Sequence, residues 1–155
     1  MDLAASPRAT TRRQSIPCVD AMLVDSSVWI PFLRGDDAPG VALLVTALKR
    51  GDAVWLAPPI LQEVLQGADN AERFDRWDRD LGELPLLTEP DPRATARKAA
   101  LLYARCRWAG ITPRSANDCL IAVHALSHNV PLLQNDRDFV AIARVEPALV
   151  LIPTP

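Results

Sequence analysis

Residues 22–26 read Met-Leu-Val-Asp-Ser, and residues 132–136 read Leu-Leu-Gln-Asn-Asp. Each segment is a short apolar run followed by an acid, which is typical of a buried strand with a charged residue at its carboxyl end. Short apolar strands that alternate with helices predict an α/β fold, in which a parallel sheet is covered on both faces. Ligands bind such sheets at the carboxyl ends of the strands, so Asp25 and Asp136 mark the edge where a site is expected.

The remaining elements follow from apolar spacing and from residues that start or end helices. Strands are expected at 22–26, 53–57, 84–88, 130–134 and 148–152. Helices are expected at 39–50, 58–66, 71–81, 92–109, 115–128 and 137–143, with a short helix or turn at 26–35 that is broken near Pro31. Prolines at the first helical turn and glycines just after the last one support these boundaries.

The composition is that of one globular domain. The chain has 155 residues, of which 49% are hydrophobic and 23% charged, and its net charge is −2. We expect a tail at residues 1–21, a single domain at 22–155 and the true start of translation at Met22. The amino-terminal segment lacks the apolar centre of a signal peptide, and no apolar run could span a bilayer, so a cytoplasmic protein is expected. Cys18, Cys106 and Cys119 match no zinc motif and are expected to be free thiols.

Four acids are placed to share one crevice. Glu63 lies in the helix after the second strand, and Asp118 lies in the first turn of the helix that leads to residues 130–134. With Asp25 and Asp136 they would form a strongly repelling group that requires a cation. Oxygen ligands suit Mg²⁺ or Mn²⁺, and the chemistry that such a site supports is hydrolysis of a phosphodiester bond.

Each acid also has a structural explanation. Asp118 fits a capping box that begins at Ser115, and Asp136 fits the cap of the short helix behind it. Glu63 fits an ordinary solvated helix residue. Asp25 is the hardest to explain in this way, because an acid at the end of a buried strand is costly without a partner.

The segments MLVDSSVWI (22–30), the helix of Glu63, RSANDCLIAVHAL (114–126) and LLQNDRDF (132–139) resemble the acidic motifs of PIN-domain ribonucleases, and most closely those of VapC-type toxins. The resemblance covers about residues 22–152. It implies a three-layer α/β sandwich with a small, mainly parallel sheet, endoribonuclease activity that depends on Mg²⁺ or Mn²⁺, a homodimer, and a small antitoxin whose tail lies across the active-site groove.

The resemblance also implies roles for individual residues. Asp25, Glu63, Asp118 and Asp136 would be the catalytic metal ligands, and Asp138 an additional ligand or supporting acid. Ser26 or Ser27, together with Asn117 and Asn135, would orient the acids. Gln134 departs from the threonine that many relatives carry at this position.

The segment 93–114 contains basic residues and no acid, which favours contact with an RNA backbone. Arg114 is closest to Asp118 in sequence and is the candidate for a phosphate contact. Tyr103 and Trp108 could stack on bases, but packing inside the protein is the interpretation we favour. His124 and His128 are four residues apart, but no glutamate between them matches the HExxH pattern, which disfavours a zinc site there.

Two other functions compete with the nuclease. A catalytically silent PIN-like module could bind RNA or protein, but all four acids are present. A phosphatase would be expected to have a DxD motif after the first strand, where this chain has Asp25-Ser-Ser. Candidates for the groove or the dimer contact are the apolar residues Trp29, Ile30, Phe32, Leu61 and Leu65.

Overall fold

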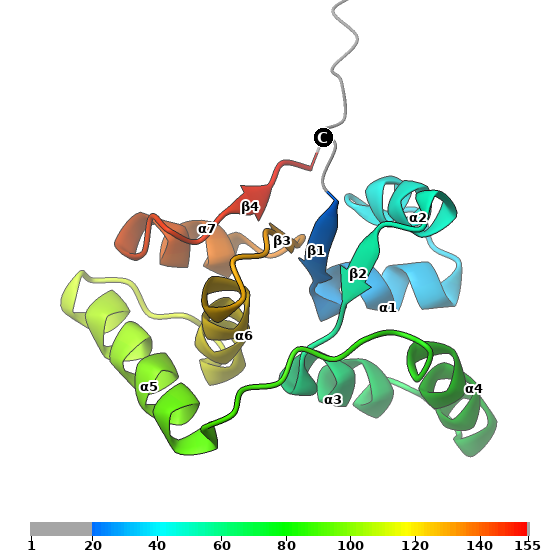
Figure 1. Cartoon of the computed structure of the whole chain (residues 1–155), viewed down its shortest axis with the longest axis horizontal. Coiled ribbons are helices and arrows are strands. Elements are labelled where there is room, and N and C mark those ends of the chain that lie inside the picture. Colours follow the sequence, from blue (N-terminus) through cyan, green and yellow to red (C-terminus); the bar gives the residue numbers. More distant parts are fainter. Residues whose placement is uncertain (1–19, 155) are drawn as a thin grey trace, which may run out of the picture.

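The computed structural model describes residues 20–154, which form a small parallel sheet surrounded by helices (Figure 1). The strands are β1 (Ala21–Val24), β2 (Ala53–Trp55), β3 (Leu132–Leu133) and β4 (Leu151–Ile152). The helices are α1 (Ser26–Arg34), α2 (Val41–Arg50), α3 (Pro58–Gln66), α4 (Ala71–Leu81), α5 (Pro92–Trp108), α6 (Ala116–Ser127) and α7 (Arg137–Val145). The predicted α/β class is confirmed.

The strand order places a topological switch beside β1. The sheet runs β2-β1-β3-β4, and all its pairings are parallel. The chain therefore moves to one side of β1 first and to the other side afterwards. Because parallel crossovers are right-handed, the helices of the first crossover and those of the later ones cover opposite faces. In Figure 1, α1 and α2 lie toward the β2 edge of the sheet, and α6 and α7 lie toward β3 and β4.

Local sequence signals set the helix ends. Asp25 caps α1 by accepting a hydrogen bond from the Ser27 backbone, and Asp91 caps α5 by accepting from Arg93 and Ala94. Pro58 opens α3, where the missing N–H of proline has no helical partner to lose. Gly35 ends α1 with φ 78°, a left-handed conformation that favours glycine.

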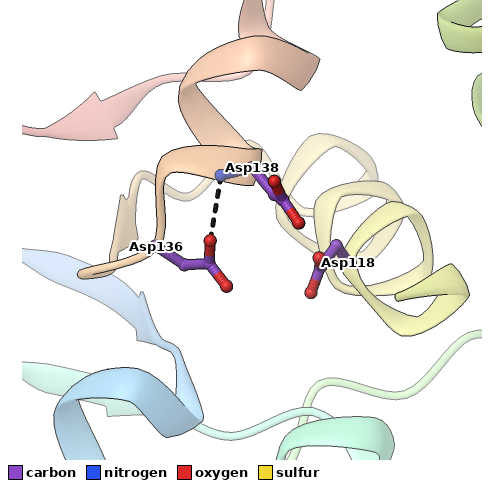
Figure 2. Close-up of side chains that lie close together, drawn as sticks. All are labelled: Asp118, Asp136 and Asp138. Atoms are coloured by element: carbon purple, nitrogen blue, oxygen red, sulfur yellow. Dashed lines mark hydrogen bonds between the residues drawn. The ribbon is translucent and has the colours of Figure 1, made fainter. Parts of the chain in front are cut away.

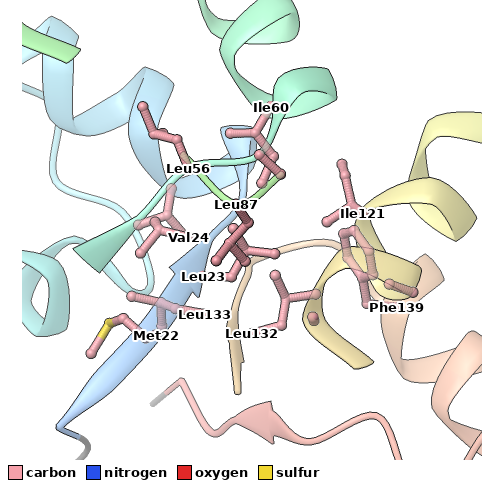
Figure 3. Packing of buried hydrophobic residues seen from close by; sticks show 14 of the residues in the cluster. Met22, Leu23, Val24, Leu56, Ile60, Leu87, Ile121, Leu132, Leu133 and Phe139 are labelled. Carbon is pink, nitrogen blue, oxygen red and sulfur yellow. The ribbon is translucent and has the colours of Figure 1, made fainter. Parts of the chain in front are cut away.

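The core lies where the strands meet the helices. Leu23, Leu132 and Leu133 are fully buried in the sheet. In Figure 3 they lie among Met22, Val24 and side chains from surrounding helices, including Ile60, Ile121 and Phe139. The strands have only two to four residues each, so this apolar contact with the helices contributes much of what holds the sheet together.

The strands expected at 130–134 and 148–152 shorten to Leu132–Leu133 and Leu151–Ile152, and two further elements differ in kind. Segment 84–88 forms a single parallel bridge between Leu86 and Leu56 and no strand. Pro85 lacks the N–H needed to extend a ladder, and of the two central leucines only Leu87 is buried. The helix at 26–34 is not broken at Pro31, because one lost hydrogen bond is offset by the burial of Val28 and Trp29 on its inner face.

Several other residues named from the sequence have a defined position in the structure. Trp29 belongs to the core and does not form a surface, while Ile30, Phe32, Leu61 and Leu65 pack half-buried against it. Ala21, predicted as the last tail residue, begins β1, and residues 1–19 lie outside the described part. Cys106 and Cys119 are free thiols as predicted, and both are buried, whereas Cys18 lies outside the described part. Among the helices of residues 20–154, none is long and apolar enough to cross a membrane.

Helix α7 offers a matched test of the core. Phe139 is fully buried, whereas its neighbour Val140 is 45% exposed. Phe139→Ala is expected to lower the free energy of unfolding by about 3–5 kcal/mol, because it leaves a cavity between the helix and the sheet. Val140→Ala should change it by less than about 1 kcal/mol. Urea unfolding followed by circular dichroism measures both values, and equal losses would contradict this core assignment.

Candidate active site

The predicted acids line one cleft at the carboxyl ends of β1 and β3. This edge lies beside the switch in strand order, where a doubly wound sheet places its ligand. The cleft has a volume of about 580 Å³. The residues that line it are Asp25, Ser26, Ser27, Ile30, Pro31, Glu63, Gln66, Arg114, Ser115, Asp118, Asp136 and Asp138.

Asp25 is held at the end of β1 by the turn into α1. Its Oδ2 accepts hydrogen bonds from the Ser27 backbone N–H at 3.0 Å and from the Ser27 hydroxyl. The Ser27 Oγ in turn accepts a bond from the backbone N–H of Asn135 at 2.9 Å. Ser27 therefore connects the ends of β1 and β3, and the predicted role of Asn135 falls to its backbone.

Glu63 is not an ordinary solvated residue of α3. Its Oε2 accepts a 2.7 Å hydrogen bond from the Ser26 hydroxyl, and its Oε1 accepts one of 3.2 Å from the side-chain amide of Asn117. These donors belong to α1 and α6. The carboxylate is thus fixed by two elements far apart in sequence.

Asp136 and Asp138 share their partners at the start of α7. Asp136 Oδ1 accepts from the Asp138 backbone N–H at 2.9 Å and from the Arg114 guanidinium at 2.8 Å. Asp138 Oδ2 accepts from both the backbone and the side chain of Arg114, each at 3.0 Å. The buried Gln134 accepts from the Asp136 backbone at 2.6 Å, which fixes the turn after β3.

Asp118, Asp136 and Asp138 form the tightest acidic group. One carboxylate oxygen from each lies within 4.8 Å of the other two, and no other such group of metal-ligating side chains occurs in residues 20–154. Figure 2 shows the three side chains converging between the first turn of α6 and the start of α7. Asp25 and Glu63 line the same cleft but lie outside this group.

Burial and mutual repulsion make Asp118 hard to ionise. Its side chain is buried, and desolvation raises its pKa to about 7, with further upward contributions from Asp136 and Asp25. Burial also raises the pKa of Asp25, although the hydrogen bonds from Ser27 oppose that shift. The pKa of Asp138 is lowered, chiefly by the backbone N–H of Arg114 and also by its side chain.

The structural explanations fit only some of these acids. Asp25 and Asp136 do cap α1 and α7. At α6, however, the cap is the Ser115 hydroxyl, which accepts from Asn117, and Asp118 completes no capping box within the described hydrogen bonds. Asp118 is therefore a buried acid whose position helix capping does not explain.

Sequence reasoning missed several features of the site. Asp138 belongs to the closely spaced acidic group, whereas it was expected only as an additional ligand or supporting acid. The sequence feature that could have revealed this is its spacing of two from Asp136, which places both acids at the start of one helix. Gln66 and Ser115, which line the cleft, were not predicted as parts of the site. Arg114 is paired with Asp136 and Asp138, whereas a free phosphate-binding side chain was expected. Trp108 is 75% exposed, so the packed interpretation of this residue is wrong.

Comparison with known proteins identifies the family. Residues 22–145 match the PIN domain. The VapC ribonuclease Mb1587 of Mycobacterium bovis is 36% identical over 126 residues, which cover 80% of this chain and 92% of the relative. Ribonuclease VapC11 of Mycobacterium tuberculosis matches with the same identity and coverage.

Solved structures share the fold at lower identity. The crystal structure of VapBC2 from Rickettsia felis, bound to a promoter DNA fragment, has a TM-score of 0.66 at 20% identity and covers 87% of this chain and 99% of its own. VapBC-1 from nontypeable Haemophilus influenzae has a TM-score of 0.63 at 19% identity, covering 84% and 96%. These structures share the fold, and the sequence matches identify the family: this chain belongs to the PIN-domain family, and within it to the VapC type.

Proposed function

We propose that this chain is an endoribonuclease that depends on Mg²⁺ or Mn²⁺ and acts as the toxin of a type II toxin–antitoxin pair. The observation that carries the proposal is the convergence of Asp25, Glu63, Asp118, Asp136 and Asp138 in one cleft. The relatives at 36% identity that are named VapC ribonucleases support the same activity.

The donor set suits a hard divalent cation. Three carboxylates approach one another closely, and burial together with the charge of the neighbouring acids raises the pKa of Asp118 to about 7. A cation removes that repulsion, and Mg²⁺ and Mn²⁺ prefer all-oxygen surroundings. The cleft contains no histidine or cysteine ligand that would favour zinc.

The acids of the cleft would have different roles in this reaction. Asp118, Asp136 and Asp138 would hold the ion, and Asp25 lines the same cleft. Such an ion supplies positive charge that activates an attacking water and stabilises charge on the phosphodiester group. Glu63 is kept in place by Ser26 and Asn117, so it is oriented to accept a proton from water or to receive a second ion.

Arg114 has a place in this scheme that differs from a simple phosphate contact. Its guanidinium pairs with two of the three clustered acids while 61% of its side chain remains exposed. It therefore serves as an internal counter-ion for the metal-free cluster. A divalent cation held by these acids would take over this counter-ion role, and the largely exposed guanidinium would then be free to contact a phosphate of the RNA.

The proposed partners follow from family membership. They are an RNA substrate, a second copy of the chain in a homodimer, and an antitoxin. The structures of VapBC2 from Rickettsia felis and of a toxin–antitoxin complex from Klebsiella pneumoniae support the antitoxin. Ile30 and Pro31 give the rim of the acidic cleft an apolar side against which an antitoxin tail could pack. A cytoplasmic location remains a prediction.

Charge removal at Asp118 tests the nuclease. Asp118→Asn should lower the rate of RNA cleavage in Mg²⁺ by about 100-fold or more, because losing even a residue that supports a metal ligand costs about 10–100-fold. Asp75→Asn, on the exposed surface of α4, is the matched control and should cut at the parent rate. Cleavage of a labelled RNA by purified protein is the measurement. Parent protein that cuts no RNA would favour a silent binding module.

The raised pKa of Asp118 predicts a pH-dependent stability. The folded, metal-free protein holds this proton up to about pH 7, whereas the unfolded chain releases it near 3.8. The proton therefore stabilises the fold at low pH, and this contribution is lost as the pH rises through 7. In EDTA, Asp118→Asn should melt at a higher temperature than the parent at pH 8, and the difference should shrink at pH 5. A difference that does not change with pH would contradict the shift.

The counter-ion role of Arg114 predicts that removing its side chain increases the affinity for Mn²⁺. Arg114→Ala should bind Mn²⁺ severalfold more tightly than the parent, because the competing guanidinium is gone, and should bind uncleaved RNA more weakly. Arg107→Ala, an exposed arginine of α5 outside the cleft, is the control for Mn²⁺ affinity. Isothermal titration calorimetry with Mn²⁺ measures the affinity. If Arg114→Ala binds Mn²⁺ as tightly as the parent or more weakly, Arg114 is not a counter-ion of the acidic group.

A further inference from the structure

Away from the cleft, three side chains of types that can bind metal ions lie near one another at the carboxyl-terminal half of α6, although they are less closely spaced than the acidic group. His124 and His128 share one face of this helix, four residues apart. Glu89, from the segment between α4 and α5, faces both. Its Oε1 lies 3.8 Å from His124 Nδ1 and 3.2 Å from His128 Nε2.

Two atoms of this group are buried without a well-formed hydrogen bond, although Glu89 Oε1 lies 3.2 Å from the His128 ring. His124 is 4% exposed. Neither its Nδ1 nor Glu89 Oε1 has a hydrogen-bond partner among the described residues. A buried polar atom left unpaired is rare in native proteins and destabilises the fold. A ligand bound by both atoms, which lie 3.8 Å apart, would satisfy them together.

The ligand chemistry favours a borderline transition metal. Imidazole nitrogens suit zinc and its neighbours, and a carboxylate completes a three-residue set that leaves one position for water. Two ligands of one tetrahedral zinc lie about 3.3 Å apart, given bonds of about 2.0–2.1 Å. The separations of Glu89 from His128 and from His124 bracket that value.

In the structure the ligand atoms of Glu89, His124 and His128 do not all lie within 4.8 Å of one another. The carboxylate oxygens of Asp118, Asp136 and Asp138 do. His128 is the residue that can move. It lies at the end of α6, and 32% of its side chain is exposed, so rotation about its side-chain bonds can bring its ring toward His124. Buried His124 supplies the fixed ligand.

We propose that Glu89, His124 and His128 form a binding site for Zn²⁺ or a similar transition-metal ion, distinct from the carboxylate cleft. None of the three lines that cleft. His128 lies ten residues beyond Asp118 on the same helix, or about 15 Å along its axis. An ion here joins the segment before α5 to the end of α6, so its role is structural. The inference stands independently of RNA cleavage.

The chain contains only two histidines, which makes the test specific. Untagged ¹⁵N-labelled protein is stripped with EDTA, dialysed and titrated with ZnCl₂ while the histidine ring signals are followed by NMR. Both rings are expected to shift, with the change complete at one equivalent of Zn²⁺. Millimolar Mg²⁺ should leave them unmoved. Zinc that enters the carboxylate cleft alone would not produce this pattern.

Matched variants assign the site. Glu89→Gln and His128→Gln keep polar side chains of similar size and should each weaken the Zn²⁺ affinity read from the remaining histidine signals by at least about tenfold. Glu72→Gln, on exposed α4, should match the parent. The proposal is overturned if only one ring shifts, if the shifts need a large excess of Zn²⁺, or if Glu89→Gln binds as tightly as the parent. RNA cleavage could persist under any of these results.

Discussion

Repulsion among carboxylates at the end of the sheet is the constraint on which the site depends. Most of these acids are compensated by nearby donors: Ser27 at Asp25, Ser26 and Asn117 at Glu63, and Arg114 at Asp136 and Asp138. Asp118 has no such donor among the described hydrogen bonds, and burial with the surrounding charge raises its pKa to about 7. The uncompensated position is therefore in the middle of the cluster, where a cation would be stabilised most.

The topology explains why a sheet of such short strands suffices to build this cluster. β1 and β3 are neighbours, and the helices that follow them lie on opposite faces. The ends of the two strands are tied together by the Asp25 N–H, which donates to the Leu133 carbonyl, and by Ser27, which accepts from Asn135. A crevice must open between the diverging helices, and it opens where both strands present their acids.

The sequence predicted what depends on local chemistry. Helix ends at Asp91, Gly35 and Pro58 are set by neighbouring residues, and the positions of Asp25 and Asp136 after apolar runs gave the edge of the sheet. Segment 84–88 was overestimated because its apolar pattern outweighed the missing N–H of Pro85. The contacts of Arg114 and Glu89, and the exposure of Trp108, depend on segments that meet only in three dimensions, so no local pattern reveals them.

The structural and functional explanations of the acids are not exclusive. Asp25 uses Oδ2 for the cap of α1, and Asp136 uses Oδ1 for the cap of α7, so each carboxylate has a second oxygen beyond the one that caps. Asparagine caps a helix about as well as aspartate does, but it carries no charge. An Asp→Asn change at either position therefore keeps the helix start and removes only the charge. In this fold the acids that shape the chain at the cleft are also those that face it, which links the geometry of the site to the stability of its helices.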